Sequence, residues 1–365
     1  MKTPSPLPVT LCSVTDLSDM LTPKGPRRQP MKGFDDEFID IVDYIVRITY
    51  RIWDEKQVDL CKRYYADSGN IQTLAGNVMG VDTVIKNTWA TLEGFPDRTL
   101  DADNVVWSGD DNEGFYSSHL ITSHMTNLGP SEYGEPTGRT ARIQTIADCV
   151  CLENKIVEEW LMRDNLGLAQ QIGQDGHEIA KRQALSDHES QNDLRDIHLN
   201  HFNRTMNTDV SGYAKKPSNP EDDATAFAQA VFGTLWNNRS LKQADQYYDY
   251  RADVNGPSGR RYYGAKQVIS YIESLLEVMP DLKVTVDHVA DVPYLEGARD
   301  IAVRWSLAGT HTGDGMYGTP TGEPIYILGG SHFRVINGRI RSEWTVWDEL
   351  AVLRQVERNR LITGK

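Results

Sequence analysis

The chain has 365 residues, of which 39% are hydrophobic and 25% charged, as is usual for folded globular proteins. Its formal net charge of −14 at pH 7 argues against nucleic acid or an anionic membrane as a partner, because both are bound through basic faces. No apolar run approaches the roughly 18 residues of a membrane-spanning helix. We therefore expect neither a nucleic-acid nor a membrane partner.

Residues 1–33 are rich in proline, serine and basic residues, a composition that predicts a disordered N-terminal arm. The four cysteines, Cys12, Cys61, Cys149 and Cys151, are too few for a disulfide framework. We interpret them as reduced thiols, which predicts a cytoplasmic protein.

The next segment begins with an amphipathic helix pattern, with apolar residues from Phe38 onward to Trp53. The sequence LAGNVMG predicts a polar turn after it. A second helix is expected from Val81 to about Leu92 and is ended by Pro96.

The same order of elements recurs later in the chain. GVDTVIKNTWATLEGFPD (80–97) aligns without a gap with GAKQVISYIESLLEVMPD (264–281). At the same offset, EEWLMRD (158–164) aligns with SEWTVWD (342–348). Several matched blocks in one order indicate a tandem duplication. We expect a first domain at 34–172 and a second at 223–365.

After the helices, each repeat changes to a period of two, which predicts β-strands. In the second repeat these runs include DLKVTVDHVADV and PIYILGGSHFRVI, and Asn337-Gly338 marks a tight turn. The predicted fold class is α+β, with a curved antiparallel sheet wrapped around the N-terminal helices of each repeat. Such a fold either leaves an apolar cavity at its open end or closes completely, and the pattern does not decide between the two.

Residues 173–222 are polar and predict a partly helical linker between the domains. Its four histidines raise the possibility of a metal site, and His198 and His201 share one helical face. No cysteine or carboxylate triad completes a ligand set, so we interpret the segment as a solvated connecting helix and expect no metal.

The repeated motif places tryptophan and aspartate on one face of a strand. If that face points inward, burial raises the pKa of the aspartate and makes it a usable general acid or base. Two alternatives are a helix N-cap and a solvated surface charge. The candidate catalytic residues are Asp164 and Asp348, and the candidate substrate-binding residues beside them are Trp160, Met162, Trp344 and Val346.

Histidines recur near equivalent strand ends, at His124 and His311. A histidine beside an inward aspartate could transfer protons, although a structural role is equally compatible with the pattern. One further position differs between the repeats, with Asp148 in the first and His332 in the second. That difference indicates either different ligands or loss of function in one repeat.

The motifs GTHTG, PTGEP and INGRIRSEWTVWDELAVLRQ of the second repeat resemble the SnoaL-like polyketide cyclases, also called ester cyclases, of the NTF2-like superfamily. FPDRTLDAD and NKIVEEWLMRDNLGLAQQIG of the first repeat resemble them more weakly. The resemblance implies two cone-shaped α+β barrels. It also implies intramolecular aldol chemistry without cofactor or metal, with Asp164 and Asp348 as general acid/base and His124, His311 or His332 in support.

We therefore expect an enzyme of this kind that acts on a small hydrophobic carbonyl compound resembling a polyketide. The alternatives are a non-catalytic binding or scaffold protein, or a hydratase, isomerase or epoxide hydrolase on the same fold. Because single domains of the superfamily commonly dimerise through their sheets, we expect the two halves to form an intramolecular pseudo-dimer, with further homo-oligomerisation left open.

Overall fold

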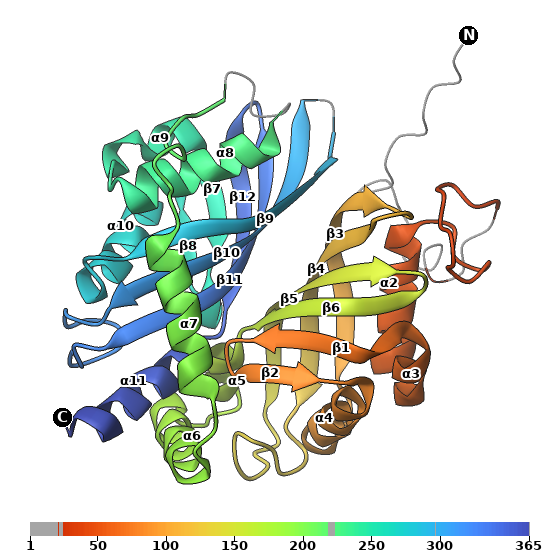
Figure 1. The fold of residues 1–365 in the computed structure, drawn as a ribbon, viewed down its shortest axis with the longest axis horizontal. Coiled ribbons are helices and arrows are strands. Elements are labelled where there is room, and N and C mark those ends of the chain that lie inside the picture. Colours follow the sequence, from red (N-terminus) through yellow and green to blue (C-terminus); the bar gives the residue numbers. More distant parts are fainter. Residues whose placement is uncertain (1–20, 22–24, 218–222, 296, 365) are drawn as a thin grey trace. The chain divides into compact units, whose positions relative to one another are not determined.

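The computed structural model describes residues 21, 25–217, 223–295 and 297–364, and Figure 1 traces their secondary structure. Contacts divide the chain into two compact units. Unit 1 comprises Met1–Thr73, Asn77–Leu161 and Ala290–Glu296, and unit 2 comprises Leu74–Gly76, Met162–Val289 and Gly297–Lys365.

The predicted N-terminal arm, residues 1–33, lies mostly outside the described residues. Residues 25–33, the described end of this arm, pack against the rest of unit 1. Met31 is only 2% exposed, and Arg27 donates hydrogen bonds to the backbone carbonyls of Phe38 and Asp35. The packed part of this unit therefore begins before residue 34.

Unit 1 opens with a helix whose start is fixed by Asp40, the side chain of which accepts a hydrogen bond from the N–H of Asp43 at 2.8 Å. The helices of this part of the chain are α2 (Ile41–Thr49), the π-helix η2 (Tyr50–Asp54), the 3₁₀-helix η3 (Val58–Leu60), α3 (Cys61–Tyr64) and α4 (Val81–Gly94). The two predicted helices are thus present, the first continuing into a π-helical turn.

The first sheet has six strands. In sheet order they are β2 (Gly76–Met79), β1 (Tyr65–Thr73), β6 (Lys155–Arg163), β5 (Thr140–Leu152), β4 (Gly114–Thr126) and β3 (Thr99–Asp110). β1 pairs with β6 in parallel, whereas β3, β4 and β5 form an antiparallel meander. The sheet is therefore mixed, and β2 includes much of the segment expected to be a polar turn.

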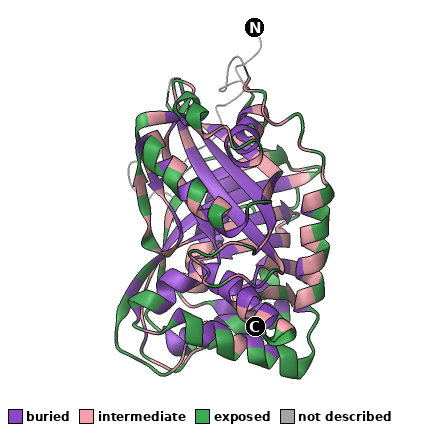
Figure 2. Cartoon of the chain, turned by 90° about the vertical axis from the view of Figure 1, so that its left-hand side faces the viewer, coloured by how far each residue is buried: buried purple, intermediate pink, exposed green. Residues whose placement is uncertain are grey.

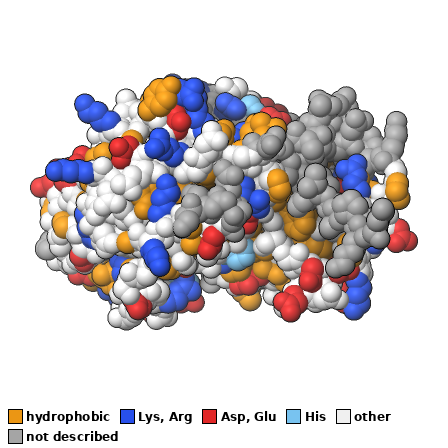
Figure 3. Space-filling view, turned by 90° about the horizontal axis from the view of Figure 1, so that it is seen from above, with side chains coloured by type: hydrophobic (Ala, Val, Ile, Leu, Met, Phe, Trp, Pro, Cys, Tyr) orange, Lys and Arg blue, Asp and Glu red, His pale blue; other side chains and the backbone are white. Residues whose placement is uncertain are grey.

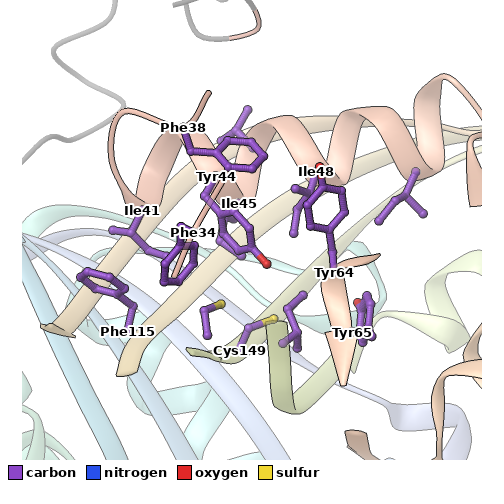
Figure 4. Close-up of a cluster of buried hydrophobic side chains, with 14 of the residues drawn as sticks. Phe34, Phe38, Ile41, Tyr44, Ile45, Ile48, Tyr64, Tyr65, Phe115 and Cys149 are labelled. Atoms are coloured by element: carbon purple, nitrogen blue, oxygen red, sulfur yellow. The ribbon is translucent and has the colours of Figure 1, made fainter. Parts of the chain in front are cut away.

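The core of unit 1 forms where α2 packs against the sheet. Figure 4 shows aromatic side chains gathered there, and Phe34 and Phe38 both meet the ring of Tyr44 edge-on. Cys149 lies in the same cluster, and Cys61, Cys149 and Cys151 are free and buried. Cys12 lies outside the described residues.

Unit 2 contains the remaining helices. They are α5 (Asn165–Gln171), α6 (Gly176–Ser190), α7 (Leu194–Asn207), α8 (Ala224–Val231), the π-helix η4 (Phe232–Asn237), the 3₁₀-helix η5 (Leu241–Gln243), α9 (Ala244–Tyr247), the 3₁₀-turn η6 (Pro257–Gly259), α10 (Gly264–Val278) and α11 (Glu349–Thr363). The elements α8, η4 and α10 correspond to the predicted helices of the second repeat.

The second sheet repeats the topology of the first. In sheet order its strands are β8 (Arg261–Tyr263), β7 (Tyr248–Asn255), β12 (Arg339–Trp347), β11 (Pro324–Ile336), β10 (Ala298–Thr310) and β9 (Lys283–Pro293). The identical order confirms the tandem duplication and the α+β class. Each sheet is curved and open rather than a closed barrel (Figure 1).

The polar segment expected to be a linker contains α6 and α7, and both helices are packed within unit 2. α6 contacts α11, and α7 contacts β10 and β11. His198 is buried, with its Nε2 2.9 Å from the carbonyl oxygen of Leu74. The interpretation of this segment as a solvated helix is therefore wrong for α7, because its buried residues cover the sheet.

The strands are largely buried, and the helices expose their outer faces (Figure 2). On the face shown in Figure 3, acidic, basic and hydrophobic side chains are interspersed. None of the described helices is both long and apolar enough to cross a membrane.

Candidate active site

The last strand of each repeat carries the repeated motif, and its alternation decides which residues face the helices. In β12, Trp347 stacks on Tyr271 of α10, with ring centroids 5.9 Å apart. Glu343 and Thr345 share this face with Trp347 by period two. Trp344 is therefore on the opposite face, paired in register with His332 of β11.

The predicted substrate-binding residues of unit 2 thus lie on the sheet face away from α10, which is also the face where His201 of α7 stacks on Tyr326. Trp344 is half-buried with the guanidinium of Arg334 5.6 Å from its ring, and Val346 is buried. In the first sheet, Asp148 accepts a hydrogen bond from the hydroxyl of Tyr116. It alternates with Cys149, which packs toward α2, so it too is on the face away from the helices. Trp160 is half-buried and Met162 is buried.

Asp348 lies at the end of β12 and caps the helix that follows. Its Oδ1 accepts a hydrogen bond from the N–H of Ala351 at 3.0 Å. Its Oδ2 accepts a hydrogen bond from the side-chain amide of Asn165 at 2.5 Å. The capping role considered for this residue is therefore present, and both carboxylate oxygens have donors.

Asp164 occupies the equivalent place at the end of β6 and caps α5. Its Oδ1 accepts from the N–H of Gly167 at 3.0 Å. In addition, the N–H of Ser258 lies 2.9 Å from Oδ1 and 3.0 Å from Oδ2. Asp164 is only 6% exposed. It is therefore both a helix cap and a buried carboxyl group that accepts hydrogen bonds from the backbone of η6.

A second carboxyl group joins Asp164 through the same serine. The hydroxyl of Ser258 donates to Oε2 of Glu349 at 2.5 Å, and Nη1 of Arg260 donates to both oxygens of Glu349 at 2.8 and 2.7 Å. Glu349 is fully buried, whereas the Arg260 side chain is 34% exposed. We call Asp164, Ser258, Arg260 and Glu349 the Asp164 cluster.

The environment of Asp164 shifts its titration toward neutrality. Burial raises the pKa of Asp164 from its ordinary 3.8 to about 6, and the negative charge of Glu349 adds to the effect. The N–H donors of Ser258 and Gly167, together with the charge of Arg260, act in the opposite direction. The cluster therefore places a group that can give or take a proton near pH 6 beside a carboxylate paired with arginine.

The predicted histidines occupy three different settings. In unit 1, Nε2 of His124 lies 3.0 Å from Oδ2 of Asp101, and both side chains are substantially exposed. In unit 2, His311 is fully buried with Nε2 3.3 Å from the carbonyl oxygen of Gly318, and burial lowers its pKa. His332 is buried on the sheet face away from α10, the face that α7 contacts. None of these contacts joins a predicted histidine to Asp164.

The structure also reveals a buried carboxyl group that the sequence reasoning missed. Oε2 of Glu343 accepts from the hydroxyl of Tyr248 at 2.7 Å, and Oε1 accepts from the hydroxyl of Thr345 at 2.5 Å. Burial raises the pKa of Glu343, and these two hydroxyls oppose the shift. The first repeat has an equivalent pair, in which Tyr65 donates to Glu159 at 2.9 Å. The signal was available, because the acid before tryptophan and the tyrosine both recur in the repeat.

The Asp164 cluster was only partly foreseeable. Asp164 stood out as the repeated aspartate, but Ser258, Arg260 and Glu349 have no counterpart in that motif. Within the described residues, no group of three or more His, Cys, Asp or Glu side chains is arranged to hold a metal ion. The chemistry that the cluster can perform with its own side chains is proton transfer.

Comparisons with known proteins give the family. The family model described as SnoaL-like polyketide cyclase matches residues 44–172 and 226–356. Among curated proteins, none matches significantly.

Solved structures match about one repeat of the chain each. One is a SnoaL-like polyketide cyclase from Agrobacterium tumefaciens, 19% identical, covering 36% of this chain and 95% of that one with a TM-score of 0.30. Another is TsrD from Streptomyces laurentii, 17% identical, covering 36% and 94% with a TM-score of 0.32. A third is wild-type IdmH from Streptomyces antibioticus, 20% identical, covering 37% and 98% with a TM-score of 0.32. Because the family model matches both repeats and well over half of the sequence, the chain belongs to the SnoaL-like polyketide cyclase family.

Proposed function

We propose that this protein is a cofactor-free acid–base enzyme that closes a ring in a small hydrophobic carbonyl compound by an aldol-type step. Asp164 is its general acid/base. Membership of the SnoaL-like polyketide cyclase family supports the reaction class. The single observation that carries the assignment is that Asp164, with a pKa of about 6, lies in one cluster with Glu349 and Arg260.

Two carboxyl groups in different environments suit an acid–base reaction. Asp164 is buried and accepts hydrogen bonds from backbone N–H groups, whereas Glu349 accepts from the guanidinium of Arg260 and the hydroxyl of Ser258. A general base works best when its pKa is close to the working pH, because it is then ionised and still basic enough to take the proton. Asp164 meets this condition near neutral pH.

The proposed step balances with the residues of the cluster alone. The ionised Asp164 takes a proton from the acidic carbon between two carbonyl groups, and the resulting enolate carbon attacks a second carbonyl of the same molecule. A carbon–carbon bond forms, the attacked carbonyl oxygen becomes an alkoxide, and the protonated Asp164 returns the proton to it. The positive charge of Arg260, on a partly exposed side chain, favours the enolate electrostatically.

Asp348, His124, His311 and His332 remain predicted catalytic residues, but we assign the central role to Asp164. Both aspartates cap a helix and have a donor on each carboxylate oxygen. We choose Asp164 because burial raises its pKa to about 6 and because it lies in one cluster with Glu349 and Arg260. The first experiment should therefore separate these two aspartates.

The test compares Asp164→Asn with the matched variant Asp348→Asn. Asparagine is a good N-cap, so both variants keep a capping oxygen while losing the titrating carboxyl group. With a panel of β-keto esters and polycyclic phenols as substrates, we expect Asp164→Asn to lower kcat/KM by about 10²–10⁴-fold. Exchange of the acidic C–H for deuterium, followed by NMR, measures proton abstraction independently of ring closure.

Equal activity of Asp164→Asn and wild type would reject the role of Asp164. If compounds bind wild type and Asp164→Asn equally and neither exchange nor cyclisation is accelerated, a non-catalytic binding protein becomes the better interpretation. If only Asp348→Asn is inactive, the acid/base is at the end of the second repeat instead.

A further inference from the structure

A small pocket in unit 2 lies between α7, the start of β11 and α11. Its volume of about 10 Å³ admits about one water-sized occupant. Among the described residues, those that line it include Arg195 and Arg358 but no aspartate or glutamate. None of the lining residues belongs to the Asp164 cluster.

Arg358 is the main polar group of this pocket. The residue is 6% exposed, and its Nε and Nη1 atoms are buried without a hydrogen-bond partner among the described residues. Only Nη2 has a contact of this kind, 3.2 Å from Nδ1 of His198. Buried charged donors left without acceptors are costly, so an acceptor at this place would stabilise the fold.

His198 does not supply the missing negative charge. Its Nε2 lies 2.9 Å from the carbonyl oxygen of Leu74, which can only accept, so Nε2 carries the proton. Nδ1 is then free to accept from Arg358. Burial, together with the charge of Arg358, lowers the pKa of His198 to about 3, and the ring is therefore neutral.

The carboxylates near Arg358 are engaged elsewhere. Asp187 accepts from Nε and Nη2 of Arg354 and from the amide of Asn192. Glu323 lies 3.9 Å from Arg195, with both side chains partly exposed. Asp187 and, more weakly, Asp196 act on Arg358 through their charges, and the charges of Arg195 and Arg354 oppose them. Within the described part of the chain, Nε and Nη1 of Arg358 therefore have no carboxylate to donate to, and Arg358 is one of the residues that line the pocket.

We propose that this pocket binds one monatomic anion, a halide such as chloride, held by Nε and Nη1 of Arg358. A water molecule would satisfy the donors but would not offset the buried charge. Phosphate, sulfate and carboxylates are too large for a site that admits one water-sized occupant. The bound halide joins α11 to α7 and β11, because the lining residues come from these three elements. The anion site is independent of the proposed catalytic role of Asp164.

Crystals soaked in sodium bromide test the site directly, because bromide scatters anomalously. We expect an anomalous peak in contact with Nε and Nη1 of Arg358. Ordered water at that place with no bromide peak would overturn the proposal.

Thermal unfolding tests the same site in solution. Sodium chloride is compared with sodium gluconate at equal ionic strength, since gluconate is too large for the pocket. We expect chloride to raise Tm by about 3–6 °C for each tenfold increase above its Kd. Arg358→Met should abolish the difference between the salts, and the matched variant Arg360→Met, on the same helix, should keep it. Equal stabilisation by both salts would overturn the proposal even if Arg358→Met fails to fold.

Discussion

The backbone N–H of Ser258 donates hydrogen bonds to both carboxylate oxygens of Asp164, at 2.9 and 3.0 Å. Asp164 ends the repeated motif of the first repeat, whereas Ser258 belongs to the loop between β7 and β8 of the second. Ser258 has a left-handed backbone conformation with φ of 57°, which non-glycine residues adopt infrequently. The geometry of this η6 loop therefore controls the electrostatic surroundings of a carboxyl group from the other repeat.

The pH dependence of stability should report the burial of Asp164. Its pKa rises from 3.8 to about 6 on folding, so the folded chain binds the proton more tightly than the unfolded chain. The resulting contribution is fully present below pH 3.8 and is lost as the pH rises through about 6. The shift corresponds to about 3 kcal/mol. Between pH 4 and pH 7, the free energy of unfolding of wild type should therefore fall by about 3 kcal/mol relative to that of Asp164→Asn, as measured by urea denaturation. If the difference in unfolding free energy between the two proteins is the same at every pH in this range, the prediction is wrong.

Asp348 should contribute to stability as a helix cap. Asp348→Ala removes the acceptor for the N–H of Ala351 and for the amide of Asn165. We expect the free energy of unfolding to fall by about 1–2 kcal/mol. Asp348→Asn should recover part of this loss, because asparagine can still accept from Ala351. Circular dichroism during urea denaturation measures both variants, and an Asp348→Ala variant as stable as wild type would exclude the capping contribution.

The two tyrosine–glutamate pairs offer a matched comparison between the repeats. Tyr248→Phe removes one of the two hydroxyl donors to the buried Glu343 and leaves Thr345 as the other. We expect a loss of about 1.5–3 kcal/mol in the free energy of unfolding and a further rise in the pKa of Glu343. Tyr65→Phe makes the same change beside Glu159. The free energy of unfolding of each variant is measured by denaturation at several pH values. A variant as stable as wild type at every pH would show that its tyrosine hydroxyl does not stabilise the glutamate.

The buried thiols of unit 1 should be unreactive in the folded protein. Burial raises the pKa of Cys61 and of Cys151 to about 12, and it raises the pKa of Cys149 as well. In a Cys12→Ser variant, a thiol-specific reagent at about pH 8 should label the chain only after denaturant is added, because the reactive species is the thiolate. Rapid labelling in native buffer, located by mass spectrometry at Cys149 or Cys151, would show that the unit 1 core opens readily.

The sequence predicted the order of elements well, because local patterns determine it. The helix expected from Val81 matches α4, and the Asn337-Gly338 turn has the positive φ values, 51° and 70°, typical of a tight hairpin. The parallel pairing of Tyr65 with Ile156 was missed. Alternation within a strand carries no information about a partner that is distant in the chain.

The candidate site was predicted less completely, for two physical reasons. β12 is apolar on both faces, with Val346 on one and Trp347 on the other, so its period could not tell which face meets the helices. The hydrogen bond from Ser258 to Asp164 and the charge interaction of Asp164 with Glu349 join segments far apart in the sequence. One sequence can suggest that an aspartate matters, but the fold decides which neighbours shift its pKa.

The division between the compact units falls after Leu161, although the family match of the first repeat continues to residue 172. A gene fragment starting at residue 223 would still encode the complete second family match. Its product would nevertheless lack Asp164, together with the helices α6 and α7 that pack on α11 and on the second sheet. The fold of unit 2 therefore depends on two segments that precede the second match: the end of the first match, which carries Asp164 and α5, and the helices α6 and α7 between the matches.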